Sequence, residues 1–120
     1  MSDRDDTVYL HHILDAIARI EEYQVGVDEA RFRQNSLIQD GFIRQIQIMG
    51  EAVRRLSPQL RSRYPAVPWQ DIAGMRHKLV HDYFGVDLEA VWLAATQDVP
   101  VLRVEIGSIL SDLSRSKEVP

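Results

Sequence analysis

The sequence contains no cysteine among its 120 residues. This absence excludes disulfide bonds, thiolate zinc sites, iron–sulfur clusters and a cysteine nucleophile, and it fits a reducing cytosol. Long hydrophobic runs are missing as well: the longest apolar stretch, residues 90–95, is far shorter than the roughly 20 residues that span a bilayer. The acidic start of the chain has no apolar stretch of the kind found in secretory signals. We therefore expect a cytoplasmic protein that does not enter the membrane.

Apolar residues make up 45% of the sequence and charged residues 27%. A chain of this length buries roughly two-thirds of its unfolded surface, so it can fold without disulfides or a structural metal. The length and composition favour a single globular domain over residues 1–120.

Apolar side chains recur at helical spacing along nearly the whole chain, and no segment shows sustained alternation of apolar and polar residues. This pattern predicts an all-α fold of four or five helices, and the short connections favour an antiparallel bundle. The first expected helix has its core positions within residues 10–20, with Asp5, Asp6 and Thr7 placed to cap its N-terminus. Gly26 ends or follows that helix.

Capping residues and prolines predict the next boundaries. Asp28 opens a second helical stretch, and a long core helix follows over residues 36–56. Ser57–Pro58 then supplies an N-cap and an N1 proline for a short turn that ends near Tyr64.

The second half of the chain shows similar signals. A helix is expected over residues 68–84, with Gly85 as its C′ residue, and Asp87 should cap the helix after it. Pro100 should break or kink that helix. Helicity should then resume before a polar tail, residues 114–120, which we expect to fray.

The net charge of −4 argues against a protein that binds nucleic acid through bulk positive charge. The charge is nevertheless uneven, because residues 1–30 carry −6, residues 31–63 carry +5 and residues 64–120 carry −3. All basic residues of the middle part are arginines, which bind phosphates and carboxylates bidentately. They are Arg31, Arg33, Arg44, Arg54, Arg55, Arg61 and Arg63. A solvated helix face is the alternative interpretation.

The common catalytic signatures, such as a P-loop, GxGxxG, GxSxG or HExxH, are absent. Potential chemistry is concentrated within residues 74–87, which hold Arg76, His77, His81 and Tyr83. On one continuous helix, Arg76 and Tyr83 would lie about 20° apart, His77 and His81 about 40°, and Arg76 and His81 about 140°. Arg76 and His81 would thus share a cleft only if the helix meets its symmetry mate or if its last turn loosens.

These side chains suit phosphodiester chemistry. A guanidinium can neutralise negative charge that develops on a phosphate, and an imidazole can move protons to and from the 2′-hydroxyl or the leaving oxygen. His81 would lie in the last turn of its helix, where the dipole favours its cationic form. With no carboxylate cluster to hold magnesium, such a site would need no metal and no other cofactor.

The same residues resemble the HepT-like branch of the HEPN superfamily, which comprises prokaryotic ribonuclease toxins. The superfamily signature is Arg, four to six residues and then His, usually with Tyr two residues after the His; here these are Arg76, His81 and Tyr83. His77 stands where this branch commonly has Asn, which leaves the identity of the proton donor open. The resemblance weakens after Trp92 and is carried by residues 35–40, 48–52, 56–58, 64–65, 68–76 and 81–87.

The resemblance implies an all-α bundle that forms a homodimer, with the two motif helices facing each other across a cleft. It also implies metal-independent RNA cleavage by attack of the 2′-hydroxyl, with Arg76 and His81 catalytic and His77 and Asp82 as supporting polar positions. Such toxins are typically encoded beside an MntA-type nucleotidyltransferase, an antitoxin that transfers AMP to the motif tyrosine, here Tyr83. AMP on Tyr83 would put a bulky negative group where the RNA phosphate must bind.

The interpretation as a nuclease has one competitor, a catalytically silent helical dimer that serves as binding partner and substrate of the nucleotidyltransferase. The acidic net charge favours that second interpretation. A basic cleft beside the motif helix, with Arg44, Arg54 and Arg55 contacting RNA phosphates, would favour the nuclease, and an acidic cleft would exclude it.

His77 and His81, at i and i+4, could also bind a metal, although no third ligand is apparent unless His11 or His12 approaches them.

Four more residues are expected to have structural roles. Trp69 and Trp92 are predicted core anchors, and Gly50 in mid-helix should permit a close helix or dimer contact. Glu51 is either a solvated carboxylate or holds an arginine near the site.

Overall fold

The computed structural model describes residues 3–80 and 85–118 of the chain. Within these residues the secondary structure is helical, and one isolated bridge joins Val80 to Val86. The helices are α1 (Asp3–Gln24), α2 (Glu29–Arg33), α3 (Ser36–Arg55), α4 (Pro58–Arg63), α5 (Trp69–Leu79), α6 (Leu88–Leu93), the π-helical segment η2 (Ala94–Asp98) and α7 (Val99–Glu118). The all-α prediction is therefore confirmed. Over the described part of the chain, no helix has the length and apolar character needed to cross a membrane.

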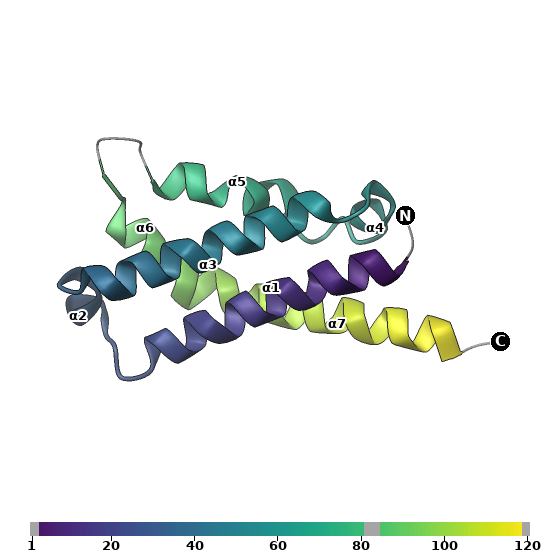
Figure 1. Ribbon diagram of the computed structural model, residues 1–120, viewed down its shortest axis with the longest axis horizontal. Coiled ribbons are helices and arrows are strands. Elements are labelled where there is room, and N and C mark those ends of the chain that lie inside the picture. The colour runs from purple at the N-terminus through teal and green to yellow at the C-terminus, as the bar shows by residue number, and fades with distance from the viewer. Residues whose placement is uncertain (1–2, 81–84, 119–120) are drawn as a thin grey trace.

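The long helices form an elongated antiparallel bundle of 54 × 29 × 20 Å. Helix α3 packs between α1 and α5, while α7 packs along α1 (Figure 1). Each helix of the pairs α1–α3, α3–α5 and α1–α7 runs opposite to its neighbour, as the short connections predicted. The start of α1 and the end of α7 lie at the same end of the bundle as α4, and α2 lies at the other end.

One hydrophobic core joins these helices; most of its largest fully buried side chains come from α1, α2 and α3, and Val91 of α6 and Ile106 of α7 join them. Trp69 is buried and its indole N–H donates to the carbonyl of Tyr64 at 3.0 Å. Trp92 is half-buried, with its ring centroid 5.3 Å from Phe32 and 6.5 Å from Phe42. Both tryptophans are therefore core anchors, as predicted.

The predicted caps of three helices are confirmed. The side chain of Asp28 accepts from the N–H of Arg31, and that of Asp87 accepts from the N–H of Ala90. Ser57 accepts from the N–H of Leu60 and is followed by the N1 proline of α4.

Asp6 does not have its predicted role as a cap of α1. Because α1 already begins at Asp3, Asp6 lies about one turn inside the helix and is only 4% exposed. Its carboxylate accepts from the backbone N–H of Ser57 at 2.8 Å and from the Ser57 hydroxyl at 2.7 Å. These bonds satisfy a buried carboxylate and fix the side chain that caps α4.

Helix α5 is shorter than predicted, because it ends at Leu79 and not at residue 83 or 84. Val80 is extended, with φ −117° and ψ 115°, and pairs with Val86. The N–H of Asp87 donates to the carbonyl of Leu79 at 2.9 Å, which satisfies one of the free carbonyls at the helix end. Gly85 has the left-handed φ of +99°. It directly precedes Val86, the residue that pairs with Val80, and it is not the C′ residue of α5, which ends at Leu79.

Pro100 does not break the last helical stretch, because α7 runs through it. The π-helical segment η2 precedes it and leads directly into α7. A proline lacks the N–H and crowds the carbonyl four residues earlier, and a wider turn relieves that contact. Helix α7 continues to Glu118, past Ser114, where fraying was expected. Residues 114–118 contain neither glycine nor proline, so no residue there stops the helix.

The prediction that Gly50 permits a close contact is confirmed within the protomer, where α3 crosses α5. A Cβ atom at Gly50 would lie 3.1 Å from the carbonyl oxygen of Ala73 and 3.3 Å from that of Ile72. These neighbours are helical backbone and cannot rotate away. A larger residue would have to push α3 and α5 apart by a few tenths of an ångström, so glycine favours the observed distance.

We predict that Gly50→Ala lowers the free energy of unfolding by about 1 kcal/mol, because overpacking against backbone outweighs the gain in helix propensity. Gly107→Ala in α7 is the matched control, since a Cβ there would meet nothing within 4 Å. That control should raise stability by roughly 0.5–1 kcal/mol. Urea unfolding of both variants checks this, and an equal gain in stability from both would show that the contact is not tight.

A hydrogen bond between Tyr64 and Asp112 joins the end of α4 to α7, with the phenol donating at 2.6 Å. Burial, together with this hydrogen bond to Asp112, raises the pKa of Tyr64 above its ordinary value of 10.0. The same hydrogen bond lowers the pKa of Asp112 below its ordinary value of 3.8. Folding therefore favours the pair of neutral phenol and charged carboxylate.

We predict that Tyr64→Phe lowers the stability of the fold mainly between pH 3.8 and pH 10.0, the ordinary pKa values of Asp112 and Tyr64. The contribution of Asp112 is present above pH 3.8 and is lost as the pH falls through the lowered pKa. The contribution of Tyr64 is present below pH 10.0 and is lost as the pH rises through the raised pKa. Thermal unfolding across this range should show the two proteins converging at both extremes, whereas a constant difference would contradict the linkage.

Candidate functional site

Arg76 and His77 lie in the last turn of α5, and both are exposed. Cationic side chains are favoured there, because the last carbonyls of a helix carry partial negative charge. Neither side chain has a hydrogen-bond or ion-pair partner among the described residues. The guanidinium of Arg76 is thus available to an anionic ligand.

The other predicted motif residues, His81, Asp82 and Tyr83, lie outside the described residues. Because α5 ends at Leu79, the angles expected from one continuous helix do not apply to them. The predictions that place His81 in a helical turn and pair it with His77 at a metal fall on a residue outside the described ranges, and they stay predictions. Over residues 3–80 and 85–118, no three potential metal ligands come together.

Arg76 and His77 border a small hollow between α5 and α3, of about 120 Å³, which we call the α3–α5 hollow. Its other lining residues come from α3, apart from Ala73, and are Ile46, Gln47, Gly50, Glu51 and Arg54. The absence of a side chain at Gly50 brings the two helices close enough to put the motif arginine beside α3.

Arg54 links the two sides of this hollow. Its Nη1 lies 2.9 Å from the Oε1 of Glu51, and its Nη2 donates to the carbonyl of Ala73 at 2.5 Å. Glu51 therefore holds an arginine beside the site, which was one of its two predicted roles. Arg54 still has 45% of its side chain exposed, so part of its guanidinium faces solvent.

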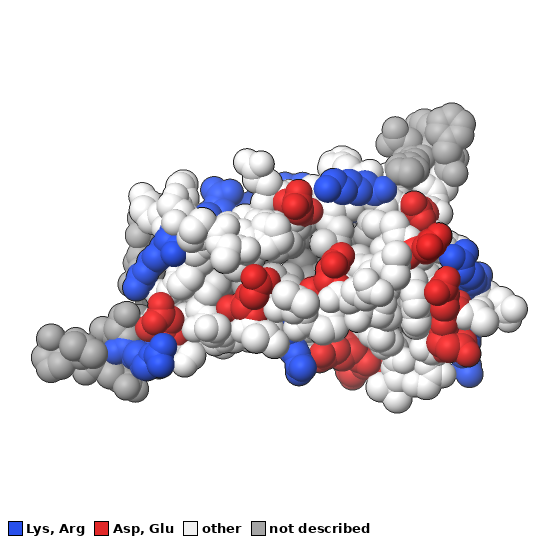
Figure 2. Space-filling view, turned by 180° about the vertical axis from the view of Figure 1, so that it is seen from behind, with Lys and Arg blue, Asp and Glu red and all other residues white. Residues whose placement is uncertain are grey.

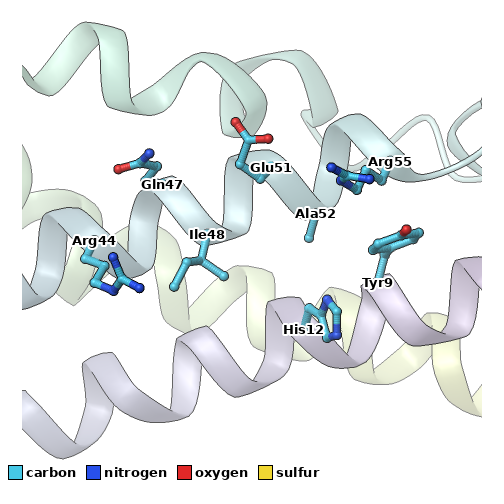
Figure 3. Close-up of a pocket in the computed structure, with 8 residues that line it drawn as sticks. All are labelled: Tyr9, His12, Arg44, Gln47, Ile48, Glu51, Ala52 and Arg55. Atoms are coloured by element: carbon cyan, nitrogen blue, oxygen red, sulfur yellow. The ribbon is translucent and has the colours of Figure 1, made fainter.

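A larger groove of about 480 Å³ lies on the other side of α3, between α3 and α1, and we call it the α1–α3 groove (Figure 3). Gln47 and Glu51 line both hollows, so only this ridge of α3 separates them. The remaining lining residues of the groove are Tyr9, His12, Arg44, Ile48, Ala52 and Arg55.

The predicted phosphate ligands are thus divided between two neighbouring hollows. Arg54 lies beside Arg76, whereas Arg44 and Arg55 lie in the α1–α3 groove. Sequence reasoning missed Tyr9 and His12 as members of this surface. A signal was present, because Tyr9 and His12 are three residues apart on α1 and Arg44 and Arg55 are eleven apart on α3, spacings that put each pair on one helix face.

The two hollows together are basic. Their lining includes the arginines Arg44, Arg54, Arg55 and Arg76, two histidines and a single carboxylate, Glu51. The opposite face differs: Figure 2 shows acidic side chains across its middle and basic ones mostly along its edges. A third hollow, between α5 and α7, includes Asp71, Asp98 and Glu105 in its lining. Among the described residues, positive charge is therefore concentrated in these two hollows.

Comparison with known proteins agrees with the motif. The model of the family described as "Ribonuclease HepT-like" matches residues 13–109. The probable ribonuclease HepT of Thermococcus cleftensis is 36% identical over 95 residues, which cover 79% of this chain and 86% of that protein. No solved structure matches the chain significantly.

Two relatives from Methanocaldococcus jannaschii carry names with a provisional RNase assignment. One is 36% identical over 113 residues, covering 94% of this chain and 97% of that protein. The other, also named a gamma-glutamylcyclotransferase, is 40% identical over 114 residues, or 95% of this chain, which spans only 51% of that relative. On the strength of the family match and of the first of these relatives, which is matched over nearly its whole length, the chain belongs to the HepT-like ribonuclease family.

Proposed function

We propose that this protein is a metal-independent endoribonuclease, the toxin of a type VII toxin–antitoxin system, which cleaves RNA through Arg76 and His81. The observation that carries the proposal is the position of Arg76, the arginine of the family motif. Arg76 is exposed, has no partner among the described residues and lies beside Arg54; the described lining of the two hollows contains four arginines and one carboxylate. Such a surface can bind the negative phosphates of RNA.

In the proposed reaction the RNA 2′-oxygen attacks the adjacent phosphorus, and the bond from phosphorus to the 5′-oxygen breaks. The 2′-hydroxyl loses a proton and the leaving 5′-oxygen gains one, so the products are a 2′,3′-cyclic phosphate and a 5′-hydroxyl. His81 moves a proton, a role that typically contributes about 10²- to 10⁴-fold in rate. Arg76 neutralises the charge that develops on the phosphate. His77, one residue after Arg76, is a second imidazole that could supply the other proton.

The proposed active form is a homodimer, in which a second copy brings its own Arg76 and His81 to a shared cleft. The antitoxin partner is an MntA-type nucleotidyltransferase, which transfers AMP to the phenolic oxygen of Tyr83. Tyr83 is two residues from His81 in the motif, so AMP there would add a bulky negative group at the RNA phosphate site. Asp82, between them, is a supporting polar position.

A second candidate function is a catalytically silent helical dimer that binds and is modified by the nucleotidyltransferase. The net charge of −4 and the acidic side chains on the face in Figure 2 favour protein contacts. The basic hollows favour the nuclease, because a protein that only docks a partner has no need for three arginines of α3 near the motif arginine Arg76.

We predict that the purified wild-type protein cleaves RNA in EDTA, whereas His81→Ala is at least about 100-fold slower, as expected for loss of a general acid or base. His11→Ala is the control histidine, because His11 is exposed on α1 and lines neither basic hollow. Gel analysis and end-group mapping should show 2′,3′-cyclic or 3′-phosphate ends. No cleavage by protein whose intact mass shows Tyr83 unmodified would favour the silent dimer.

We further predict that incubation with the nucleotidyltransferase and ATP adds AMP to the wild-type protein and abolishes cleavage. Tyr83→Phe should remain unmodified and retain activity in the presence of the partner, since it lacks the acceptor oxygen. Tyr23→Phe serves as a tyrosine control, because Tyr23 lies on α1 at a distance of 60 residues along the chain from Tyr83. Intact-mass spectrometry measures the modification, and AMP found on Tyr83→Phe would refute the assignment.

A further inference from the structure

The α1–α3 groove contains cationic side chains that the fold itself does not use. Arg44 and Arg55 are exposed and have no hydrogen-bond or ion-pair partner among the described residues. By contrast, Arg33 pairs with Glu29 and Arg103 with Glu21. The one carboxylate in the groove, Glu51, is bound to Arg54 and points toward α5 (Figure 3). Among the side chains that the structure describes, the groove therefore presents positive charge without a paired carboxylate.

Aromatic rings form the opposite wall of this groove. Tyr9 and His12 project from α1 toward α3, with ring centroids 5.7 Å apart and planes at 84° (Figure 3). Ile48 and Ala52 provide an apolar floor between the two arginines. A perpendicular pair of rings can stack a base on one ring while the edge of that base meets the other.

The length of the groove suits a short stretch of a single strand. Arg44 and Arg55 are eleven residues apart on one helix, which corresponds to about 16 Å at about 1.5 Å per residue. A stacked strand with about 3.4 Å per nucleotide places some five nucleotides over that distance, and an extended strand fewer. The ridge of Gln47 and Glu51 is all that separates this stretch from Arg76.

We propose that the α1–α3 groove binds single-stranded RNA next to the cleavage site, with Arg44 and Arg55 on its phosphates and Tyr9 and His12 against a base. This inference rests on the proposed nuclease function and extends it, because it gives the substrate a second point of attachment outside the motif. Cleavage is then directed to single-stranded stretches, since a paired base cannot reach the rings.

The test is direct binding of a fluorescein-labelled 2′-O-methyl RNA of about eight nucleotides, a length within the range typical of single-strand sites. This probe lacks the attacking hydroxyl, so fluorescence anisotropy reports binding whether or not the protein cleaves. Arg44→Gln and Arg55→Gln should each weaken binding and lower the slope of log affinity against log salt by about 0.7, the value for one lost phosphate contact. Arg31→Gln, an equal charge change on α2 outside both hollows, should leave the slope unchanged.

The aromatic wall is tested separately. Tyr9→Leu should weaken binding by about 5- to 10-fold with an unchanged salt slope, and Tyr9→Phe should restore it, because stacking needs the ring and not the charge. Circular dichroism confirms that each variant is folded. Equal losses from Arg31→Gln and the groove variants, or no loss from Tyr9→Leu, would overturn the proposal.

Cleavage and oligomeric state, measured on the same variants, distinguish RNA binding in the groove from the nuclease activity and from a protein interface. Probe binding that depends on the groove, in a protein that cleaves no RNA, would sustain the groove and refute the nuclease. Normal cleavage with wild-type probe affinity in Arg44→Gln and Arg55→Gln would refute the groove alone. A change in the monomer–dimer equilibrium without a change in RNA affinity, measured by light scattering, would make the groove a protein interface and refute RNA binding there.

Discussion

The close packing of α5 on α3 is the constraint on which the candidate site depends. At Gly50 the two backbones approach so closely that even one methyl group would press on the carbonyl of Ala73. Arg54 accompanies this contact, because it binds the same carbonyl and Glu51 together. Arg76 follows Ala73 by three residues, so the contact that joins the helices also sets the distance from the motif arginine to the arginines of α3.

Local signals in the sequence were sufficient for most of the fold. Periodic apolar residues predicted α3, and the short polar side chains at Asp28, Ser57 and Asp87 predicted helix starts, because capping depends on residues only a few positions apart. The end of α5 could not be predicted in the same way. It depends on the pairing of Val80 with Val86 and on a bond from Asp87 to Leu79, and helix propensity carries no information on such contacts.

The residues of the candidate site could be predicted from the sequence motif, but the hollows in which they lie could not. Arg76 and the arginines of α3 were identified by residue type, whereas their division between two hollows follows from the rotation of α3 against α1 and α5. Tyr9 and His12 were missed for the same reason, since the groove exists only where two helices from different parts of the chain meet. Single-helix spacing shows which residues share a face and does not show which faces meet.

The buried bond between Asp6 and Ser57 has a consequence for how the chain is made. Its two residues are 51 positions apart, so during synthesis α1 leaves the ribosome long before its partner exists. Until then the carboxylate of Asp6 remains hydrated, although α3, against which α1 packs, precedes Ser57 in the chain. The bond that fixes α1 to the cap of α4 can therefore form only after nearly half of the chain has been made, later than the first contacts of α1 with α3 become possible.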